Sequence, residues 1–412
     1  MRTILHIDFD SFFASVEQQH NPIFRNKPLG VTATNGRNCI IASSREAKAL
    51  GIGTATRVHD ALKLCPTINL TSADFRKYWV ESQKFIEICK DFSPYVEVFS
   101  IDELFMDITQ SAHLFGGTDR LIKQIKQRIA QEVGAYITVS VGVSYNKMLA
   151  KMGSGLRKPN GITKITPENL IHVYRNAILT DICGIGQRIQ ARLNSMGIYT
   201  LSQLHHAPLP TLIAEFGNVE GTFLKRVGLG IDESNVIPYT ETPTVKSVSR
   251  EYCLPHNQYD KHIVLQNIYE LCEEVGIKLR RLHKKARSAG VFIRGTTSIK
   301  GHKTYKTYFS TGKEMFAICS AVLSQNKEAF YNGYVRQIGV WAGNLEDIQH
   351  TPLSLFDTQK SEKLLETIDI LNNKFGDHTI RNGFLLYADK LTTVPNGWMS
   401  DTYERTLLSS AF

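Results

Sequence analysis

The chain has 412 residues, a length that predicts about two to four domains, because one hydrophobic core rarely organises so many residues. Hydrophobic residues make up 42% and charged residues 21% of the chain, which excludes wholesale disorder and predicts a globular protein. No run of about 18 apolar residues occurs, so a membrane-spanning helix is not expected. The 48 Lys and Arg against 39 Asp and Glu give a formal charge of +9, which favours a polyanionic partner.

The positive charge is concentrated in one part of the chain. Residues 1–235 carry a net charge of +5, residues 236–345 carry +8 and residues 346–412 carry −4. A solvated basic surface is the simplest explanation of such an excess, and a surface that binds a polyanion is the alternative. Charge alone leaves both explanations open.

The seven cysteines are widely separated, odd in number and form no C-x-x-C pair. This spacing argues against a disulfide framework and against a zinc site. The apolar stretch at the N-terminus is interrupted by His6 and Asp8, unlike a secretory signal. We therefore expect a soluble protein of a reducing compartment, the cytoplasm.

The first 163 residues predict a mixed α/β block. Short apolar runs rich in Ile and Val predict strands at 3–9, 29–33, 38–42, 95–100, 104–108 and 136–143. Helical periodicity predicts helices at 12–18, 44–50, 76–92, 118–132 and 146–153.

The rest of the chain divides into a helical part, a linker and a second α/β part. Residues 165–231 predict a small all-α unit, and residues 232–245, with two prolines, predict a linker. A new domain should begin near Lys246. Its expected elements are strand 246–254, helix 260–284, strands 287–295 and 303–309, helix 312–328 and strand 334–341, a βαββαβ order. The acidic tail beyond should contain a helix at 361–374 and be partly disordered.

Two pairs of carboxylates are the strongest chemical signal. Asp8 and Asp10 lie two residues apart in the first strand, so alternation predicts that they share a face. Asp102 and Glu103 are adjacent and can serve one site only if the chain turns there, as at a hairpin apex. Divalent cations such as Mg²⁺ prefer oxygen ligands, and two ions about 4 Å apart suit phosphoryl transfer. From spacing alone, ordinary solvated or salt-bridged acids remain an equal alternative.

Five ordered motifs resemble those of the Y-family DNA polymerases, the DinB/UmuC-type translesion enzymes. They are HIDFDSFFASVE (6–17), SREAKALG (44–51), FSIDELFMD (99–107), VSVGVSYNKMLAK (139–151) and LRKPNG (156–161). The resemblance spans about residues 1–345. It implies a low-fidelity, template-directed polymerase of DNA repair and the SOS response that adds dNMP from dNTP to a primer opposite undamaged or damaged bases.

The resemblance also implies a right-hand architecture, α/β and α+β in class. The domains that it implies are a palm (1–10 and 75–163), fingers (11–74), a thumb with a helix-hairpin-helix (164–233), a linker (234–244), a βαββαβ little finger (245–345) and a tail (346–412).

The same resemblance assigns the catalytic carboxylates. It makes Asp8, Asp102 and Glu103 ligands of two Mg²⁺ ions, with the main-chain carbonyl of Phe9 as a further ligand. Asp10 then has a structural role and is not a metal ligand, although strand alternation alone would pair it with Asp8. The implied chemistry is in-line attack of a primer 3′-hydroxyl on the nucleotide α-phosphate with release of pyrophosphate.

A nucleotide site follows from the same motifs. Phe13 stands where the family places an aromatic gate against the ribose 2′-hydroxyl. Many relatives carry Tyr and Arg where this chain has Arg45 and Lys48, so the geometry of triphosphate contact is open. The nucleotide-binding residues that the resemblance implies are Phe12, Phe13, Ser43, Arg45, Lys48 and Lys158.

Contacts with DNA and with a protein partner are also implied. In the thumb, glycines of a helix-hairpin-helix allow main-chain N–H groups to approach a phosphate, and primer-template DNA is the expected polyanion. Leu353, Leu355 and Phe356 resemble a sliding-clamp-binding peptide, although Pro352 replaces its usual Gln. The alternative is a tail that docks back on its own protein. The expected DNA-binding residues are Gly184, Gly186, Arg188, Lys246 and Arg250, in a bacterial-type, nucleoid-associated enzyme.

Two other classes of protein compete with the polymerase. A catalytically inactive relative that only bridges DNA and clamp would not need Asp8, Asp102 and Glu103 together. A two-metal nuclease would share these acids but would not need Phe13 or the Lys158 motif.

Overall fold

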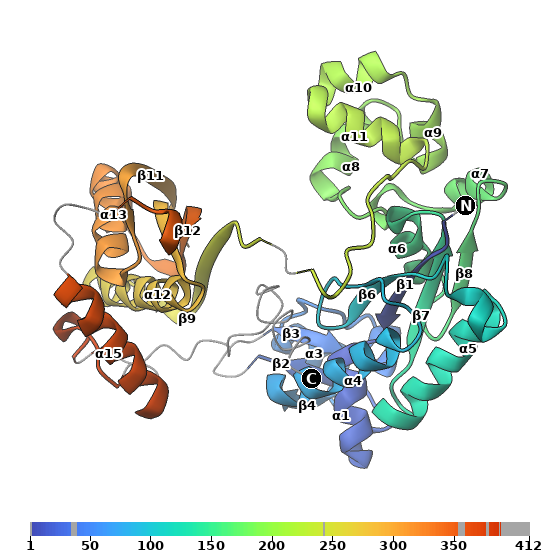
Figure 1. Cartoon of the computed structure of the whole chain (residues 1–412), viewed down its shortest axis with the longest axis horizontal. Coiled ribbons are helices and arrows are strands. Elements are labelled where there is room, and N and C mark those ends of the chain that lie inside the picture. The colour runs from blue at the N-terminus through green and yellow to red at the C-terminus, as the bar shows by residue number, and fades with distance from the viewer. Residues whose placement is uncertain are drawn as a thin grey trace. The chain divides into compact units, whose positions relative to one another are not determined.

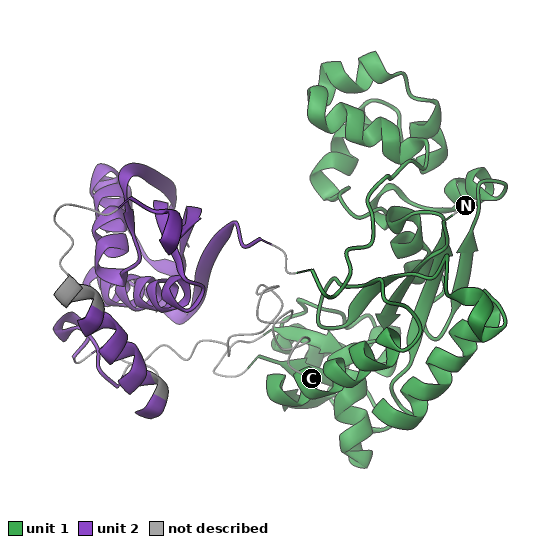
Figure 2. Ribbon diagram, in the orientation of Figure 1, with its two compact units in different colours: residues 1–243, 395–412 green, residues 244–394 purple. Residues whose placement is uncertain are grey.

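The computed structural model describes residues 2–33, 39–241, 244–352, 359–375, 379–386 and 388. The chain forms two compact units, residues 1–243 and residues 244–394, which are described separately (Figures 1 and 2). In the described part of the chain, no helix is both long and apolar enough to cross a membrane.

The centre of the first unit is a five-stranded sheet in the order β5-β6-β1-β7-β8. Strand β1 lies in the middle and pairs antiparallel with β6 and β7. The predicted strands are present, and β8 was not predicted because two of its four residues are exposed. The bounds are β1 Ile4–Phe9, β5 Val96–Val98, β6 Glu103–Asp107, β7 Val139–Ser144 and β8 Ile162–Ile165.

Strand β1 is apolar on both sides because helices cover both faces of the sheet. Leu5, Ile7 and Phe9 belong to the large core beneath α1 (Phe12–His20), α4 (Phe75–Lys90) and α5 (Thr118–Arg128). Ile4 packs in a separate cluster with Ala150, which belongs to α6 (Lys147–Leu156) on the other face (Figure 1). This double coverage fixes the position of β1 and therefore of Asp8 near its end.

Gly142 of β7 is where the sheet and α6 approach most closely. A Cβ atom there would lie 1.9 Å from the carbonyl oxygen of Ala150 and 2.5 Å from the nitrogen of Ser154. Gly142→Ala should therefore destabilise the fold by about 3 kcal/mol or more, measured by thermal or urea unfolding. Gly155→Ala is the control, because nothing lies within 4 Å of its Cβ position and alanine favours a helix. Equal melting temperatures for the two variants would contradict the packing described.

A small three-stranded sheet, in the order β3-β2-β4, follows α1 in the chain. It has its own core, in which Ile40 packs with Ala47 and Ile52. Strand β4 and helix α3 were not predicted, because β4 has only four half-exposed residues and α3 is seven residues long. The bounds are β2 Leu29–Thr32, β3 Ile40–Ser43, α2 Arg45–Ala49, α3 Val58–Leu64 and β4 Asn69–Ser72.

The predicted all-α part of the first unit is confirmed. It has a core that includes Tyr174, whose hydroxyl donates to the carbonyl oxygen of Val227 at 2.7 Å. The helices are α7 Leu170–Asn176, α8 Gln187–Ser195, α9 Leu201–His206, α10 Leu209–Phe216 and α11 Asn218–Gly228.

The second unit has the predicted βαββαβ order. Its four-stranded antiparallel sheet runs β11-β10-β12-β9, with α12 and α13 packed against it. A short helix, α14, follows α13. The bounds are β9 Ser247–Gln258, α12 Lys261–Arg281, β10 Lys284–Gly295, β11 Ser298–Phe309, α13 Gly312–Gln325, α14 Lys327–Tyr331 and β12 Val335–Asp347.

The helix expected in the tail is present as α15 (Gln359–Phe375). It is held to α12 by Arg280, whose Nε and Nη2 lie 2.6 and 2.7 Å from the carboxylate oxygens of Asp369. The side chain of Gln266 also donates to the carbonyl oxygen of Phe384 at 2.8 Å. The described part of the tail is thus attached to the second unit, in line with the alternative that the tail docks back on its own protein. The clamp-like residues Leu353, Leu355 and Phe356 lie outside the described residues.

Candidate active site

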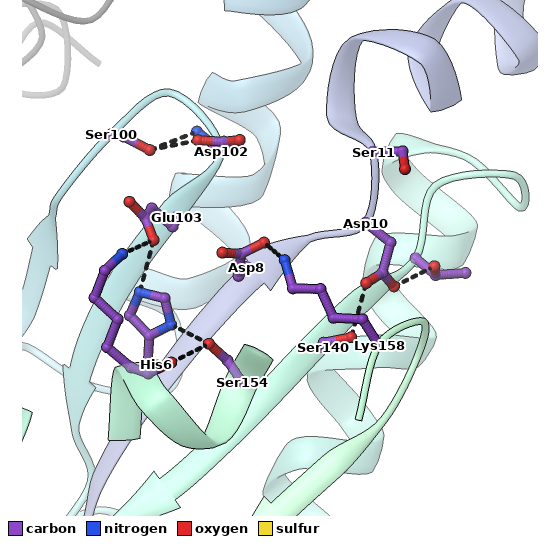
Figure 3. Close-up of polar contacts among 12 residues, drawn as sticks. His6, Asp8, Asp10, Ser11, Ser100, Asp102, Glu103, Ser140, Ser154 and Lys158 are labelled. Carbon is purple, nitrogen blue, oxygen red and sulfur yellow. Dashed lines mark hydrogen bonds and ion pairs between the residues drawn. The ribbon is translucent and has the colours of Figure 1, made fainter. Parts of the chain in front are cut away.

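The three predicted carboxylates come together where β1 and the β5–β6 hairpin meet (Figure 3). Asp8 pairs in register with Glu103, and the main-chain N–H of Phe9 donates to the carbonyl oxygen of Asp102 at 2.9 Å. The side chain of Ser100 hydrogen-bonds the Asp102 carboxylate inside the turn. The chain therefore turns at the acidic pair, as the sequence predicted, and this turn places both acids beside Asp8.

Asp10 is separate from this cluster. Strand β1 ends at Phe9, but Asp10 still lies on the Asp8 side of the sheet, because its carboxylate contacts Ser140, the residue paired with Asp8. The buried Asp10 carboxylate accepts hydrogen bonds from Thr138 Oγ1 at 2.6 Å, Ser140 Oγ at 2.7 Å and the Asn160 N–H at 2.7 Å. These bonds tie β1 to β7 and to the loop after α6, which supports a structural role.

Burial disfavours the negative charges of Asp8 and Asp102. It raises the pKa of Asp8 to about 6, although the neighbouring Lys158 ammonium, which contacts Asp8 Oδ1, acts in the opposite direction. Burial likewise raises the pKa of Asp102, against the hydrogen bond from Ser100. Buried carboxylates of this kind gain from a bound cation.

Glu103 has a different environment. Burial would raise its pKa, but contacts with His6 and Lys151 outweigh burial and lower the pKa to about 2. His6 Nε2 lies 3.0 Å from Glu103 Oε2, and the Lys151 ammonium contacts the same oxygen. The other ring nitrogen of the buried His6 lies 2.7 Å from Ser154 Oγ, and burial lowers the pKa of His6. Glu103 is therefore held ionised and oriented.

Sequence reasoning missed His6, Lys151 and Ser154. The signals were available: His6 precedes Asp8 by two residues in a strand, so both face the same side of the sheet. Lys151 and Ser154 are three residues apart on α6, so they share a helix face. Neither pattern shows by itself that α6 packs over β1.

The donor set fits a hard divalent cation. Ligand atoms of His6, Asp8 and Glu103 lie within 4.8 Å of one another, and Asp102 lies at the adjoining turn. Carboxylate oxygens are what Mg²⁺ prefers, and the Lys158 and Lys151 ammonium groups contact two of these carboxylates. The three carboxylates thus have the chemistry that such an ion requires, while the two ammonium groups balance two of their three negative charges.

A hollow of about 280 Å³ adjoins the carboxylates. Phe13 lines it, and so do Lys48 and Ser43 from the small sheet and its helix. The Lys48 ammonium donates to Ser11 Oγ at 2.8 Å, and burial lowers its pKa. The lining residues are Asp8, Phe9, Ser11, Phe12, Phe13, Ile41, Ala42, Ser43, Lys48, Thr54, Asp102 and Lys158. The hollow therefore unites acids, ammonium groups and aromatic rings.

The side chain of Arg45 is not among those that line the hollow. Its guanidinium contacts Thr138 Oγ1 and lies 3.9 Å from Asp10 Oδ2. The residue thus links α2 to β1 and β7, whereas Lys48, one helical turn later, faces the hollow.

The glycines predicted to contact DNA in the all-α part have different environments. Gly184 has a φ of +110°, and a Cβ atom on it would lie 2.7 Å from the ring of Phe223. Packing and backbone conformation therefore already require glycine there. Gly186 has open space around its Cβ position, and Arg188 is exposed in the first turn of α8.

The basic residues of the second unit are partly used for its own folding. Lys246 is exposed before β9, but Arg250 is half-buried and donates to Glu274 Oε2 at 3.1 Å. Within the basic segment 278–287, Lys278 is buried and Lys284 lies 2.9 Å from Asp347. Because Asp347 lies outside residues 236–345, this pair leaves less positive charge available to a partner than the +8 of that segment suggests.

Family models match three parts of the chain. The impB/mucB/samB family matches residues 7–155, and its C-terminal domain matches residues 245–355. A DNA polymerase-iota thumb domain matches residues 180–232. The first match contains the three carboxylates of the cluster.

Relatives and a solved structure match over most of the chain. A DNA polymerase IV of Pelotomaculum thermopropionicum is 32% identical over 383 residues, covering 92% of this chain and 94% of the relative. A DNA polymerase IV of Oceanobacillus iheyensis is 31% identical, covering 92% and 91%. A solved Y-family DNA polymerase chimera matches with a TM-score of 0.72 at 25% identity, covering 84% of this chain and 99% of the chimera. The chain therefore belongs to the impB/mucB/samB family, the Y-family DNA polymerases of the DinB type.

Proposed function

We propose that this chain is a translesion DNA polymerase that extends a primer 3′-hydroxyl with dNMP taken from dNTP, directed by a template. The observation that carries the proposal is the convergence of Asp8, Asp102 and Glu103 beside a hollow lined by Lys48 and Lys158. Acids in this arrangement suit a cation, and ammonium groups opposite them suit a triphosphate.

In this proposal the primer 3′-oxygen attacks the α-phosphorus, the bond to the bridging oxygen breaks and pyrophosphate leaves. Asp8, Asp102, Glu103 and the carbonyl oxygen of Phe9 would hold two Mg²⁺ ions, which supply charge stabilisation for the attacking and leaving oxygens. Lys48 and Lys158 neutralise the triphosphate from the lining of the hollow. His6 and Lys151 keep Glu103 ionised.

We assign the palm to the five-stranded sheet with α4, α5 and α6, and the fingers to the small sheet with α2 and α3. The all-α part is assigned as thumb and the βαββαβ unit as little finger. The fingers helices have only five and seven residues, so they constrain a nascent base pair weakly. We propose low fidelity and lesion bypass on that basis, and we extend the proposal to a role in DNA repair, within the cytoplasm and at the nucleoid.

A primer-extension assay with dNTPs and Mg²⁺ tests the proposal. Template-directed lengthening of the primer is the expected result. Shortening of the primer would instead favour a nuclease, and tight DNA binding without extension would favour a DNA-bridging protein. The same assay on a template with an abasic or alkylated base tests lesion bypass against an undamaged control.

Metal binding should depend on pH. Because Asp8 has a pKa of about 6 in the metal-free protein, a cation must displace a proton below that pH. Affinity for Mn²⁺, measured by the EPR signal of the free ion, should fall about tenfold from pH 7 to pH 5, with about a fivefold fall between pH 6 and pH 5, and level off above pH 7. Glu103, with a pKa of about 2, stays ionised throughout. An affinity that does not change between pH 5 and pH 7 would contradict the assignment of Asp8.

Clamp binding is a separate part of the proposal. It rests on the resemblance of Leu353, Leu355 and Phe356 to a clamp-binding peptide. A double substitution, Leu355→Ala with Phe356→Ala, should leave distributive synthesis unchanged and abolish stimulation by a bacterial sliding clamp. This variant is preferable to truncation after residue 345, which would also remove α15 and its ion pair with Arg280. Undiminished stimulation would disprove clamp binding through this peptide.

A further inference from the structure

The ring of Phe13, the proposed sugar gate, rests on an aromatic neighbour. It stacks on Tyr78 with ring centroids 4.3 Å apart and planes 13° apart. Phe75 meets both rings edge-on, at 6.0 Å from each. Because Tyr78 is fully buried, Phe13 can move away from the hollow only if Tyr78 moves too.

The hydroxyl of Tyr78 is held by a buried carboxylate. It donates to Glu17 Oε1 at 2.7 Å, and burial together with Glu17 raises the pKa of Tyr78, so the hydroxyl stays a donor. Glu17 is only 4% exposed. Lys77 balances its charge, with Nζ at 3.0 and 2.9 Å from the two carboxylate oxygens.

The spacing along α1 explains why one tyrosine reaches both groups. Phe13 and Glu17 are four residues apart, so they lie one turn apart on the same helix face. The ring of Tyr78 covers Phe13 while its hydroxyl reaches Glu17. Stacking of two aromatic rings contributes only modestly beyond the burial of their surface, so stacking alone would hold Tyr78 weakly. The hydrogen bond to Glu17 fixes its position along α1.

We propose that Glu17, with its partner Lys77, is a positioning residue for sugar discrimination. Through Tyr78 it keeps Phe13 from retreating when the 2′-hydroxyl of a ribonucleotide presses on the ring. The inference rests on the proposed function of Phe13 as a gate. Glu17 and Lys77 are not among the residues that line the hollow, so they act on the nucleotide only through Tyr78 and Phe13.

The most direct test is Tyr78→Phe, which keeps the stacked ring and removes the hydroxyl. The measured quantity is kcat/KM for a dNTP divided by kcat/KM for the matching rNTP. We expect this ratio to fall about three- to tenfold, chiefly through a lower KM for the rNTP, with dNTP incorporation within about twofold of wild type. Glu17→Met, which removes the acceptor at similar volume, should lower the ratio in the same way. A merely structural role would slow both sugars equally and leave the ratio unchanged.

Glu81→Gln is the matched control. Glu81 is another buried acid between the same helices, on α4, but it pairs with His20 Nε2 at 3.0 Å, near the far end of α1 from Phe13. It should lower the melting temperature without changing the sugar ratio. Melting curves of all variants identify any that fail to fold.

Phe13→Ala separates the inference from the proposal on which it rests. If Phe13→Ala lowers the sugar ratio while Tyr78→Phe and Glu17→Met leave it at the wild-type value, the positioning role is wrong and the gate stands. If Phe13→Ala itself leaves the ratio unchanged, the gate is wrong and the positioning role falls with it.

Discussion

Asp102→Asn is expected to reduce the rate of primer extension by about 10³-fold or more. The amide has the shape of the carboxylate but no charge, so it cannot balance a divalent cation beside Asp8 and Glu103. The loss should appear in the single-turnover rate of nucleotide addition, with DNA affinity measured separately by fluorescence anisotropy and nearly unchanged. Reduced chemistry with retained DNA binding would separate a catalytic from a folding defect.

The same substitution, Asp102→Asn, should not lower the stability of the metal-free protein, although it lowers the activity. Burial raises the pKa of Asp102, so its ionised form is disfavoured in the metal-free fold. Asn removes that buried charge, and the metal-free variant should unfold at the same or a higher temperature than wild type at pH 7. Added Mg²⁺ should raise the melting temperature of wild type more than that of the variant.

Asp107→Asn is the control for this experiment. Asp107 is the last residue of β6, the strand that follows Asp102, and accepts a hydrogen bond from the N–H of Thr109 at 2.9 Å, away from the cluster. It should extend primers at close to the wild-type rate. If Asp102→Asn keeps more than about a tenth of the wild-type activity, the assignment of Asp102 as a metal ligand is wrong.

The parts of the site that the sequence predicts are those with a local cause. Asp102 and Glu103 are adjacent, so any site that uses both needs a turn, and the hairpin between β5 and β6 supplies it. The apolar run of β1 predicts a buried strand, because strands of a sheet that is covered on both faces are apolar along their whole length. The βαββαβ order follows from alternating periodicity in the same way. Each of these depends on residues close together in the chain.

The parts that the sequence could not predict depend on contacts between distant residues. Lys151 reaches Glu103 across 48 positions, and Tyr78 reaches Glu17 across 61. The pairing of Arg280 with Asp369, 89 residues apart, attaches α15 to α12. Composition shows only that charges exist, whereas their pairing depends on which helix packs on which face. The net charge of +8 over residues 236–345 illustrates this, since Arg280 and Lys284 of that segment pair with Asp369 and Asp347, which lie beyond it.

Phe13→Ala should admit ribonucleotides. Phe13 lines the hollow beside Asp8, and its ring occupies space that a smaller side chain would leave open. Discrimination against rNTP should fall by about 10²-fold, the range over which a shaped pocket rejects one added hydroxyl. The measurement is kcat/KM for each sugar with the same base and template. Incorporation of dNTP should fall by less than about tenfold, because the three carboxylates and both lysines remain.

Phe12→Ala is the neighbouring control. Phe12 stacks on Phe9 with ring centroids 4.6 Å apart, within the core. Its loss should lower stability by about 3 kcal/mol and slow both sugars, with a much smaller change in their ratio than Phe13→Ala causes, although Phe12 also lines the hollow and contacts the Phe13 ring. Phe13→Leu, which creates a smaller cavity, tests the same gate where Phe13→Ala is too unstable to assay. If both Phe13→Leu and Phe13→Ala have the wild-type sugar ratio, Phe13 is only a packing residue. Sugar selection would then depend on other residues that line the hollow.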